Sequence, residues 1–228
     1  MPRKTNPSIE RMKSGIPGLD KLIGGGFMKG SSILVTGSTG TGKTILCCQF
    51  IHEGLKNGER CMYITFEELP EEITADALVF GWDFEKYEKS GKLTLTFKDP
   101  FQATDITTRL ENEIIQNNIT RVIIDSTSLL GLYFKNPNDI RRELYKLINA
   151  LKSSGATAIL TAEVPKDNGI SRFGVEEYVA DGVLILRMTT IASSTSRTLE
   201  IIKMRRTKIE GGSHPFIIGP DGVSLKSS

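Results

Sequence analysis

Apolar residues along the chain recur in two patterns that alternate from residue 33 onward. Short runs rich in β-branched and aromatic residues are typical of strands, and they occupy residues 33–35, 61–66, 93–97, 122–124, 158–161, 183–186 and 199–202. Apolar residues three or four positions apart are typical of one helix face, as in Ile106, Leu110 and Ile114, and in Ile140, Leu144, Leu147, Ile148 and Leu151. We expect further helices over residues 43–57 and after Pro70, because proline suits a first helical position.

Strands that alternate with helices predict an α/β fold, with a mostly parallel central sheet flanked by helices on both faces. The run at 122–124 is wholly apolar, which is typical of a parallel strand buried on both faces. From residue 183 onward the strands follow one another without helices, so we expect antiparallel strands at one edge of the sheet. Residues 126–138 and 165–177 lack periodicity and follow core strands, at the edge where α/β proteins bind ligands.

A glycine-rich segment between the first strand and the first helix matches the pattern G-x-x-x-x-G-K-[ST] in full. Its glycines let several backbone N–H groups converge on phosphate oxygens at the positive end of a helix. We expect Lys43 to reach the outer phosphates and Thr44 to offer its hydroxyl to Mg²⁺. The sequence therefore predicts an ATP and Mg²⁺ site whose phosphate contacts come from Gly37, Ser38, Thr39, Gly40, Thr41, Gly42, Lys43 and Thr44.

Carboxylates end two of the predicted strands at the same edge. Asp125 follows the run at 122–124, and we expect it to hold Mg²⁺ through a bound water; the alternative is an aspartate that only caps a turn. Glu67 and Glu68 follow Phe66. Adjacent carboxylates in an extended chain point to opposite sides, so we expect one to activate the attacking water and the other to support it. The alternative for this pair is a solvated opening of a loop.

These motifs together resemble the KaiC-type ATPases of the RecA superfamily, so the fold expected is that of a RecA-like P-loop NTPase. The resemblance rests on residues 14–20, 24–27, 37–44, 65–68, 80–82, 122–126, 172–177 and 197–201. It extends over about residues 14–225 and is to one KaiC domain rather than to a tandem pair. We therefore expect an ATPase domain over residues 14–228, preceded by an extension over residues 1–13.

The resemblance implies a homo-oligomeric ring, usually hexameric, with ATP at each boundary between subunits. It assigns the catalytic glutamate to Glu67 with Glu68 beside it, and adds Ile45 to the phosphate contacts. The family's basic motif, which reaches the neighbour's nucleotide, falls on Lys203, Met204, Arg205 and Thr207.

The spacing of the basic motif supports its assignment to an anionic site. Leu199, Ile201, Lys203 and Arg205 are two residues apart, so on a regular strand they share one face. Two apolar residues followed by two cations carry a buried strand out toward an anion. The alternative is an edge strand protected by positive charge.

The chain departs from the family pattern at several positions. Arg206 stands where the family often has glycine, and either adds a phosphate contact or distorts the loop; Ile209 stands where the family often has histidine. The family's phosphorylated Ser-Thr pair falls on Glu177 and Tyr178, so autophosphorylation at that pair is not expected.

Composition narrows the class of protein further. Of 228 residues, 39% are hydrophobic and 25% are charged, which is ordinary for a soluble domain. No apolar run reaches the roughly 18–20 residues of a membrane span, and the first residues lack the apolar core of a secretory signal. We therefore expect a cytoplasmic protein that does not bind membranes.

Three functions remain open from the sequence, one of them a nucleotide-stabilised scaffold with negligible turnover, against which Glu67 argues. The other two differ in what the protein binds. The first is an ATPase ring that acts as a switch or timer through unidentified protein partners. The alternative is a RecA-like DNA-binding module that uses the aperiodic segments. The net charge is only +2. The segments hold three cations, Lys135, Lys166 and Arg172, against four carboxylates at or beside their ends, Asp139, Asp167, Glu176 and Glu177. We therefore expect at most weak binding of nucleic acid.

Overall fold

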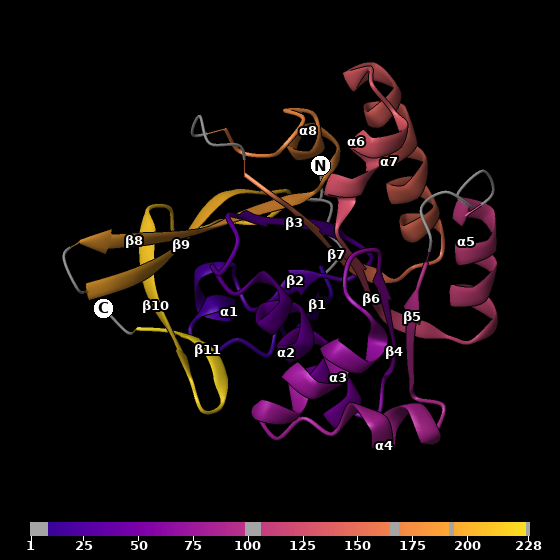
Figure 1. The fold of residues 1–228 in the computed structure, drawn as a ribbon, viewed down its shortest axis with the longest axis horizontal. Helices are drawn as coiled ribbons and strands as arrows, with labels where there is room; N and C mark the ends of the chain where they lie inside the picture. Colours follow the sequence, from indigo (N-terminus) through magenta and orange to yellow (C-terminus); the bar gives the residue numbers. More distant parts are fainter. Residues whose placement is uncertain (1–8, 99–105, 165–168, 192–193, 227–228) are drawn as a thin grey trace, which may run out of the picture.

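Within residues 9–98, 106–164, 169–191 and 194–226, which the computed structural model describes, a nine-stranded sheet forms the centre of the molecule (Figure 1). Its strand order is β11-β10-β9-β8-β3-β7-β6-β4-β5. The strands are β3 (Ser32–Gly37), β4 (Arg60–Thr65), β5 (Leu93–Phe97), β6 (Ile119–Asp125), β7 (Thr157–Ala162), β8 (Gly182–Ile191), β9 (Ser194–Met204), β10 (Ser213–Gly219) and β11 (Gly222–Leu225).

The sheet has a parallel part and an antiparallel part. Strands β8, β3, β7, β6, β4 and β5 run parallel. Strands β9, β10 and β11 continue the sheet as antiparallel neighbours. The predicted α/β fold, mostly parallel with antiparallel C-terminal strands at one edge, is confirmed.

Helices cover both faces of the sheet, as Figure 1 shows. One face carries α1 (Leu19–Leu22), α2 (Lys43–Lys56), α3 (Pro70–Val79) and α4 (Phe84–Lys89). The other carries α5 (Ile106–Gln116), α6 (Leu130–Tyr133), α7 (Pro137–Ser153) and α8 (Glu176–Val179). A small sheet pairs β1 (Arg11–Met12) with β2 (Phe27–Met28). Among the helices described, none is both long enough and apolar enough to cross a membrane.

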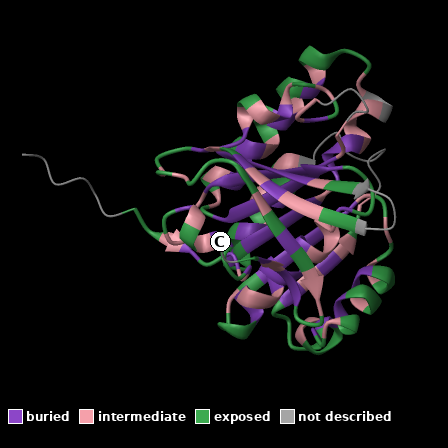
Figure 2. Ribbon diagram, turned by 90° about the vertical axis from the view of Figure 1, so that its left-hand side faces the viewer, coloured by how far each residue is buried: buried purple, intermediate pink, exposed green. Residues whose placement is uncertain are grey.

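Two apolar cores fill the space between the sheet and its helices. The first contains Phe50 and Leu55 of α2 and Leu184 of β8, and the second contains Leu110 of α5 and Leu151 of α7. Every residue of β3 and of β7 is buried, as expected for parallel strands covered on both sides. Figure 2 shows the buried residues concentrated in the sheet and the exposed ones on the outer helices.

Most predicted elements are found within one or two residues of their expected bounds. Helix α3 begins at Pro70, and Glu72 accepts a hydrogen bond of 2.8 Å from the N–H of Leu69, which caps it. Leu110 and Ile114 face the second core as predicted, whereas the side chain of Ile106 lies outside the described part. The helices α1, α4, α6 and α8 and the strands β1, β2, β10 and β11 were not predicted individually. Strand β1 lies within the expected N-terminal extension and puts Met12 into the first core.

The prediction that Leu199, Ile201, Lys203 and Arg205 share one strand face is wrong. Ile201 pairs with Leu184 and Lys203 pairs with Val183, so Ile202 is an extra residue, a bulge in β9. A bulge reverses the alternation of side chains that follow it. Lys203 therefore lies on the opposite face from Ile201, and Arg205 follows the end of the strand.

Candidate active site

The phosphate loop, residues 37–44, joins the end of β3 to the start of α2. Gly40 and Gly42 have φ angles of 79° and 102°, in the left-handed region that suits glycine. A Cβ atom at Gly37 would lie 2.7 Å from the carbonyl oxygen of Leu186, so a larger residue would collide with β8. The loop thus presents its backbone at the N-terminus of α2, where the helix dipole favours an anion.

Lys43 and Thr44 open the helix that follows the loop. The Lys43 Nζ atom donates hydrogen bonds of 2.8 Å to the carbonyl of Gly37 and 3.2 Å to the carbonyl of Ser38. The Thr41 side chain is buried and bonds the Ser38 carbonyl at 2.8 Å. The ammonium group is therefore at the mouth of the loop, beside the space that phosphates would occupy.

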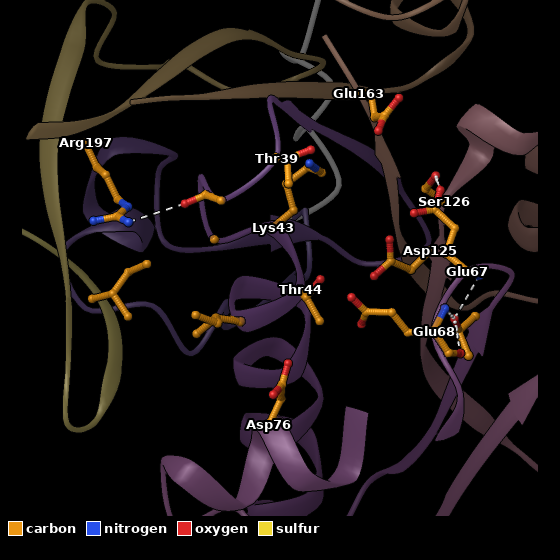
Figure 3. Close-up of a pocket in the computed structure, with 15 residues that line it drawn as sticks. Thr39, Lys43, Thr44, Glu67, Glu68, Asp76, Asp125, Ser126, Glu163 and Arg197 are labelled. Carbon is orange, nitrogen blue, oxygen red and sulfur yellow. Dashed lines mark hydrogen bonds between the residues drawn. The ribbon is translucent and has the colours of Figure 1, made fainter. Parts of the chain in front are cut away.

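A cavity of about 320 Å³ lies against this loop (Figure 3). Six predicted phosphate contacts line it, namely Thr39, Gly40, Gly42, Lys43, Thr44 and Ile45. The predicted carboxylates Glu67, Glu68 and Asp125 line it as well. Parallel strands β3, β4 and β6 end at the same edge, which we call the phosphate-loop edge. That common end is the reason why three separate sequence motifs meet here.

Two hydroxyl groups hold the Asp125 carboxylate in place. Tyr63 donates to one of its oxygens at 2.7 Å and Thr161 donates to the other at 2.5 Å. Burial, followed by the charge of Asp125, raises the pKa of Tyr63 well above its usual value, so its hydroxyl stays a donor. The aspartate is thus kept as an acceptor beside Thr44.

The oxygen atoms of Thr44 and Asp125 are of the hard type that Mg²⁺ prefers. Within the described residues, no group of three or more histidine, cysteine, aspartate or glutamate side chains could hold a metal ion. A Mg²⁺ ion usually binds through one or two protein oxygens, with phosphate oxygens and waters completing its shell. The donor set therefore fits a Mg²⁺ ion that arrives with a nucleotide.

Glu67 and Glu68 differ in their surroundings. The Thr65 hydroxyl accepts hydrogen bonds from both of their backbone N–H groups, at 3.3 and 3.1 Å, and donates to the Glu68 carbonyl at 2.8 Å, which fixes the turn after β4. Glu67 is exposed, and its carboxylate accepts a 2.5 Å hydrogen bond from Ser126. In Figure 3 the Glu68 carboxylate points toward Thr44 and Asp125.

The Glu68 carboxylate is poorly compensated. Its Oε2 atom is buried, and no group in the described part of the chain donates to it. Burial raises the pKa of Glu68, and the charges of Asp125 and Asp76 raise it further. A carboxylate in this condition would gain from a cation or from a donor brought by a ligand.

Sequence reasoning gave no site role to six further residues that line the cavity, namely Thr65, Asp76, Ser126, Glu163, Arg197 and Ile218. Arg197 donates a 3.3 Å hydrogen bond to the carbonyl of Gly40, and its buried Nε atom has no partner among the described residues. It reaches the loop because β9 lies between β8 and β10 in the sheet. A single arginine at the start of a strand carries no local signal of such a role.

The basic motif lies at the opposite edge of the sheet from the phosphate loop. Met204 pairs with Gly182, and Gly182 pairs with Ile33 near the start of β3, whereas the phosphate loop follows the end of β3. Lys203 Nζ donates to the carbonyl of Glu177 at 2.7 Å. None of Lys203, Met204, Arg205 and Thr207 lines the cavity of its own chain.

The remaining residues of this motif also have internal contacts. The Thr207 hydroxyl donates to the Arg205 carbonyl at 3.2 Å and accepts from Arg11 at 3.2 Å. The Met204 side chain is buried in the first core, so only its backbone is free to meet a ligand. Arg206 has a φ angle of 54°, the left-handed conformation that glycine adopts without strain. Ile209 packs against the first core.

The aperiodic segments contain little free positive charge. Arg172 forms an ion pair with Glu163, Lys135 is exposed, and Lys166 lies outside the described residues. Part of segment 126–138 is helical, in a 3₁₀ turn (Thr127–Leu129) and α6. These contacts give no support to a DNA-binding surface governed by phosphate neutralisation.

Comparison with known proteins gives one consistent result. Residues 12–228 match the protein family described as the KaiC ATPase. The circadian clock protein KaiC3 of Synechocystis sp. is 35% identical over 230 residues, covering 95% of this chain and 46% of that protein. The circadian clock oscillator protein KaiC of Synechococcus elongatus is 36% identical over 230 residues, covering 96% of this chain and 44% of that protein. The chain thus spans about half the length of the curated relatives it matches.

A solved structure agrees with these relatives. The KaiC-like protein of the hyperthermophilic archaeon Pyrococcus horikoshii OT3 matches with a TM-score of 0.88 and 39% sequence identity, covering 96% of this chain and 100% of that chain. Both the RecA-like fold and the phosphate-loop motif are therefore those expected from the sequence. Taken with the match over residues 12–228, they show that this chain belongs to the KaiC ATPase family, as an ATP-binding P-loop domain of that family.

Proposed function

We propose that this protein hydrolyses Mg²⁺-bound ATP in a homo-oligomeric ring, with each active site completed by the neighbouring subunit. The observation that carries the proposal is the position of Lys203 and Arg205. Lys203 lies near the end of β9 and Arg205 directly follows that strand, at the edge of the sheet opposite the phosphate loop. Both are therefore remote from the cavity of their own chain. A second copy is the natural acceptor of these cations.

At the phosphate-loop edge, we assign each residue one role. The N-terminus of α2 and Lys43 bind the phosphate oxygens. Thr44 and Asp125 would hold Mg²⁺, which would supply positive charge to the phosphate oxygens during transfer of the γ-phosphoryl group. The hydroxyls of Tyr63 and Thr161 keep the Asp125 carboxylate oriented toward this position.

Glu67 is our candidate for the base that orients and activates the attacking water, and its bond to Ser126 supports that role. A positioned base contributes about 10²–10⁴ in rate. Glu68 assists from the side of Thr44 and Asp125. Its raised pKa and its unpaired oxygen suit a group that binds a water of the metal shell.

The neighbour supplies the missing cations in this proposal. A face that carries the phosphate loop and a different face that carries Arg205 would form a head-to-tail contact, and such contacts generate a ring when the rotation between subunits closes. An arginine that reaches the γ-phosphate is worth about 10³–10⁵ in rate. We expect a hexamer of this kind, in line with the sequence resemblance.

The relatives named above are circadian clock proteins, and we propose for this chain a role as a nucleotide-driven switch or timer that acts through protein partners. Glu177 and Tyr178 stand at the family's phosphorylated pair, so autophosphorylation at that pair is not part of the proposal.

The test mixes two inactive variants, Glu67→Gln and Arg205→Ala. In mixed rings some boundaries join an intact Glu67 to a neighbour's intact Arg205, so part of the ATPase activity returns. The control is each variant mixed with itself, which restores nothing. If co-assembled subunits regain no activity, the active site is not shared and the proposal fails.

A further inference from the structure

We propose that Asp181 is a positioning residue, which holds Arg205 in the orientation that delivers its guanidinium to the neighbour's nucleotide. This inference rests on the shared active site proposed above. Asp181 was not singled out by any motif, and it does not line the nucleotide cavity. Its carboxylate nevertheless contacts both Ser32, at the start of β3, and the side chain of Arg205.

Asp181 is itself rigidly fixed. It is buried, with 5% of its surface exposed. Its backbone N–H donates to the Ser32 carbonyl at 2.8 Å, and its Oδ2 atom accepts from the Ser32 N–H at 3.0 Å. Ser32 begins β3, the strand that leads to the phosphate loop. The carboxylate is therefore anchored to the central strand of the sheet.

The other carboxylate oxygen, Oδ1, faces two cations. Arg205 NH1 approaches it at 3.3 Å and Lys152 Nζ at 2.9 Å. The backbone N–H of Arg205 also donates to the Asp181 carbonyl at 2.9 Å. Asp181 thus holds Arg205 both by its backbone and by its side chain.

The guanidinium of Arg205 makes a second contact and still has N–H donors available. Its NH2 atom contacts the carbonyl of Tyr178 at 3.4 Å, while half of the side chain remains exposed. A guanidinium has five N–H donors in a rigid fork. Two contacts set its orientation and leave other donors for phosphate oxygens. An arginine fixed in this way loses less conformational freedom when it meets the neighbour.

Asp181 also balances a crowded group of cations, Lys152, Lys203 and Arg205. Burial lowers the pKa of Lys203 and the charge of Arg205 lowers it further, whereas the charge of Asp181 acts in the opposite direction. One buried carboxylate thus keeps the cations together and leaves the group with net positive charge.

The decisive variant is Asp181→Asn, because an asparagine oxygen can still accept from the Ser32 N–H while the charge that holds Arg205 is lost. We expect kcat to fall by about 10–10², the usual consequence of misplacing a catalytic group by about an ångström. We expect KM for ATP to change little, because the phosphate loop is intact. The control is Lys152→Met, which removes the other ion pair of Asp181: it lowers the melting temperature and leaves kcat unchanged.

Mixed rings separate a positioning role from a structural one. Asp181→Asn mixed with Glu67→Gln regains activity, because the Glu67→Gln subunit donates an intact Arg205. Asp181→Asn mixed with Arg205→Ala gains none, because both defects lie on the donating face. The double variant Asp181→Asn/Arg205→Ala is no slower than Arg205→Ala alone, since the held group is already absent.

Three results would overturn the inference. They are an unchanged kcat in folded Asp181→Asn rings, added loss in the double variant, and complementation of Arg205→Ala by Asp181→Asn. If Asp181→Asn does not fold, Arg205→Lys decides. Lysine lacks the planar fork whose NH1 and NH2 ends contact Asp181 and the Tyr178 carbonyl, so full activity of Arg205→Lys would remove the two-point hold. Failure of Glu67→Gln to complement Arg205→Ala refutes the shared site itself, whatever Asp181 does.

Discussion

Charged side chains at the two edges of the sheet differ in how many of their hydrogen-bond partners lie within the chain. At the phosphate-loop edge, no described residue donates to the buried Oε2 atom of Glu68, and the Lys43 ammonium donates to two carbonyl groups of its own loop. At the edge where the parallel strands begin, Arg121 is buried with 1% of its surface exposed, yet all three of its nitrogen atoms are hydrogen-bonded within the chain. Glu68 at the first edge thus has room for a hydrogen-bond partner from a ligand, whereas Arg121 at the second edge finds its partners within the chain.

Arg121 uses donors on all three of its nitrogen atoms. Nε and NH2 contact the two oxygens of Glu59 at 3.0 and 2.9 Å, and NH1 donates to the carbonyls of Lys13 and Phe50 at 2.9 and 3.0 Å. Its guanidinium also lies 4.6 Å from the centre of the Phe50 ring. A buried charge is tolerated when it is paired and hydrogen-bonded in this way.

The comparison teaches which charges serve binding and which serve stability. A charged group that lacks hydrogen-bond partners gains interaction free energy when a ligand supplies them. A charged group that already has its partners within the chain can only be destabilised when one of them is substituted. Arg205 lies between these cases, since it is half exposed and its contacts are longer, at 3.3 and 3.4 Å. That intermediate state suits a side chain held in place but still able to meet a second molecule.

The largest expected effect is at the phosphate-loop edge. Glu67→Gln should slow ATP hydrolysis by about 10²–10⁴ because it removes the base that activates water. ATP affinity should remain, since the phosphate loop is untouched. Single-turnover hydrolysis and calorimetric titration measure the two quantities. Glu68→Gln is the matched control and should slow turnover less; if it abolishes turnover while Glu67→Gln does not, the two roles are reversed.

The sequence predicted this edge well because its signals are local. The phosphate loop is a contiguous motif, and Asp125, Glu67 and Glu68 each end an apolar run. Parallel strands must end together, so the meeting of these residues followed from the fold class alone. Most strands and helices were found for the same reason, from the spacing of their own apolar residues.

Features that depend on pairing between distant segments were not predicted. The bulge at Ile202 arises from the register of β9 against β8, and a period-two pattern cannot reveal it. Arg197 reaches Gly40 only through the strand order of the sheet. Arg121 precedes the predicted strand at 122–124, and nothing near it in the sequence indicates its burial, because its partner Glu59 is 62 positions away. These contacts are tertiary, so local propensity carries no record of them.

The second effect is at the opposite edge and concerns stability. Arg121→Met should destabilise the fold by about 3–5 kcal/mol, the usual cost of breaking a buried ion pair by removing one partner. ATP affinity of the folded protein should stay the same. Urea denaturation followed by the fluorescence of Trp82, the single tryptophan, measures the free energy of unfolding.

Arg142→Met is the control for this variant. Arg142 is 61% exposed in its ion pair with Asp139, and pairs of that kind contribute about 0–1 kcal/mol. Equal destabilisation by the two substitutions would mean that burial of Arg121 adds nothing, and the contrast between the two edges would be lost.

A smaller effect on stability concerns Glu59, the carboxylate of the same ion pair, at acid pH. Burial raises the pKa of Glu59, but hydrogen bonds from Arg121 and Thr120 outweigh it, so the pKa lies below its usual 4.5. A carboxylate with a lowered folded pKa contributes stability above its unfolded pKa, and this is lost as the pH falls through the folded pKa. Wild-type stability should therefore fall more steeply below pH 4.5 than that of Glu59→Gln. Parallel acid titrations of the two unfolding free energies would contradict the pairing.

The smallest effect has the opposite sign and belongs to Glu68. Its pKa is raised by burial and by neighbouring carboxylates, so between its usual and its raised pKa the folded state binds more protons than the unfolded state. Stability then falls as the pH rises through this window, and the penalty persists above it. Glu68→Gln should therefore raise the denaturation midpoint of the nucleotide-free protein at pH 7.5, and the gain should vanish below pH 4.5.

Mg²⁺-bound ATP should remove most of this advantage, because a metal ion and its waters supply the partners that the wild-type carboxylate lacks. The measurement is the denaturation midpoint of both proteins with and without the nucleotide, and the control is Glu88→Gln. The pKa of Glu88 is also raised by burial and by neighbouring carboxylates, but Glu88 does not line the cavity, so its substitution should respond to pH and not to ATP. If ATP stabilises Glu68→Gln as much as it stabilises the wild type, Glu68 does not face the ligand. The contrast between the two edges of the sheet would then not concern nucleotide binding.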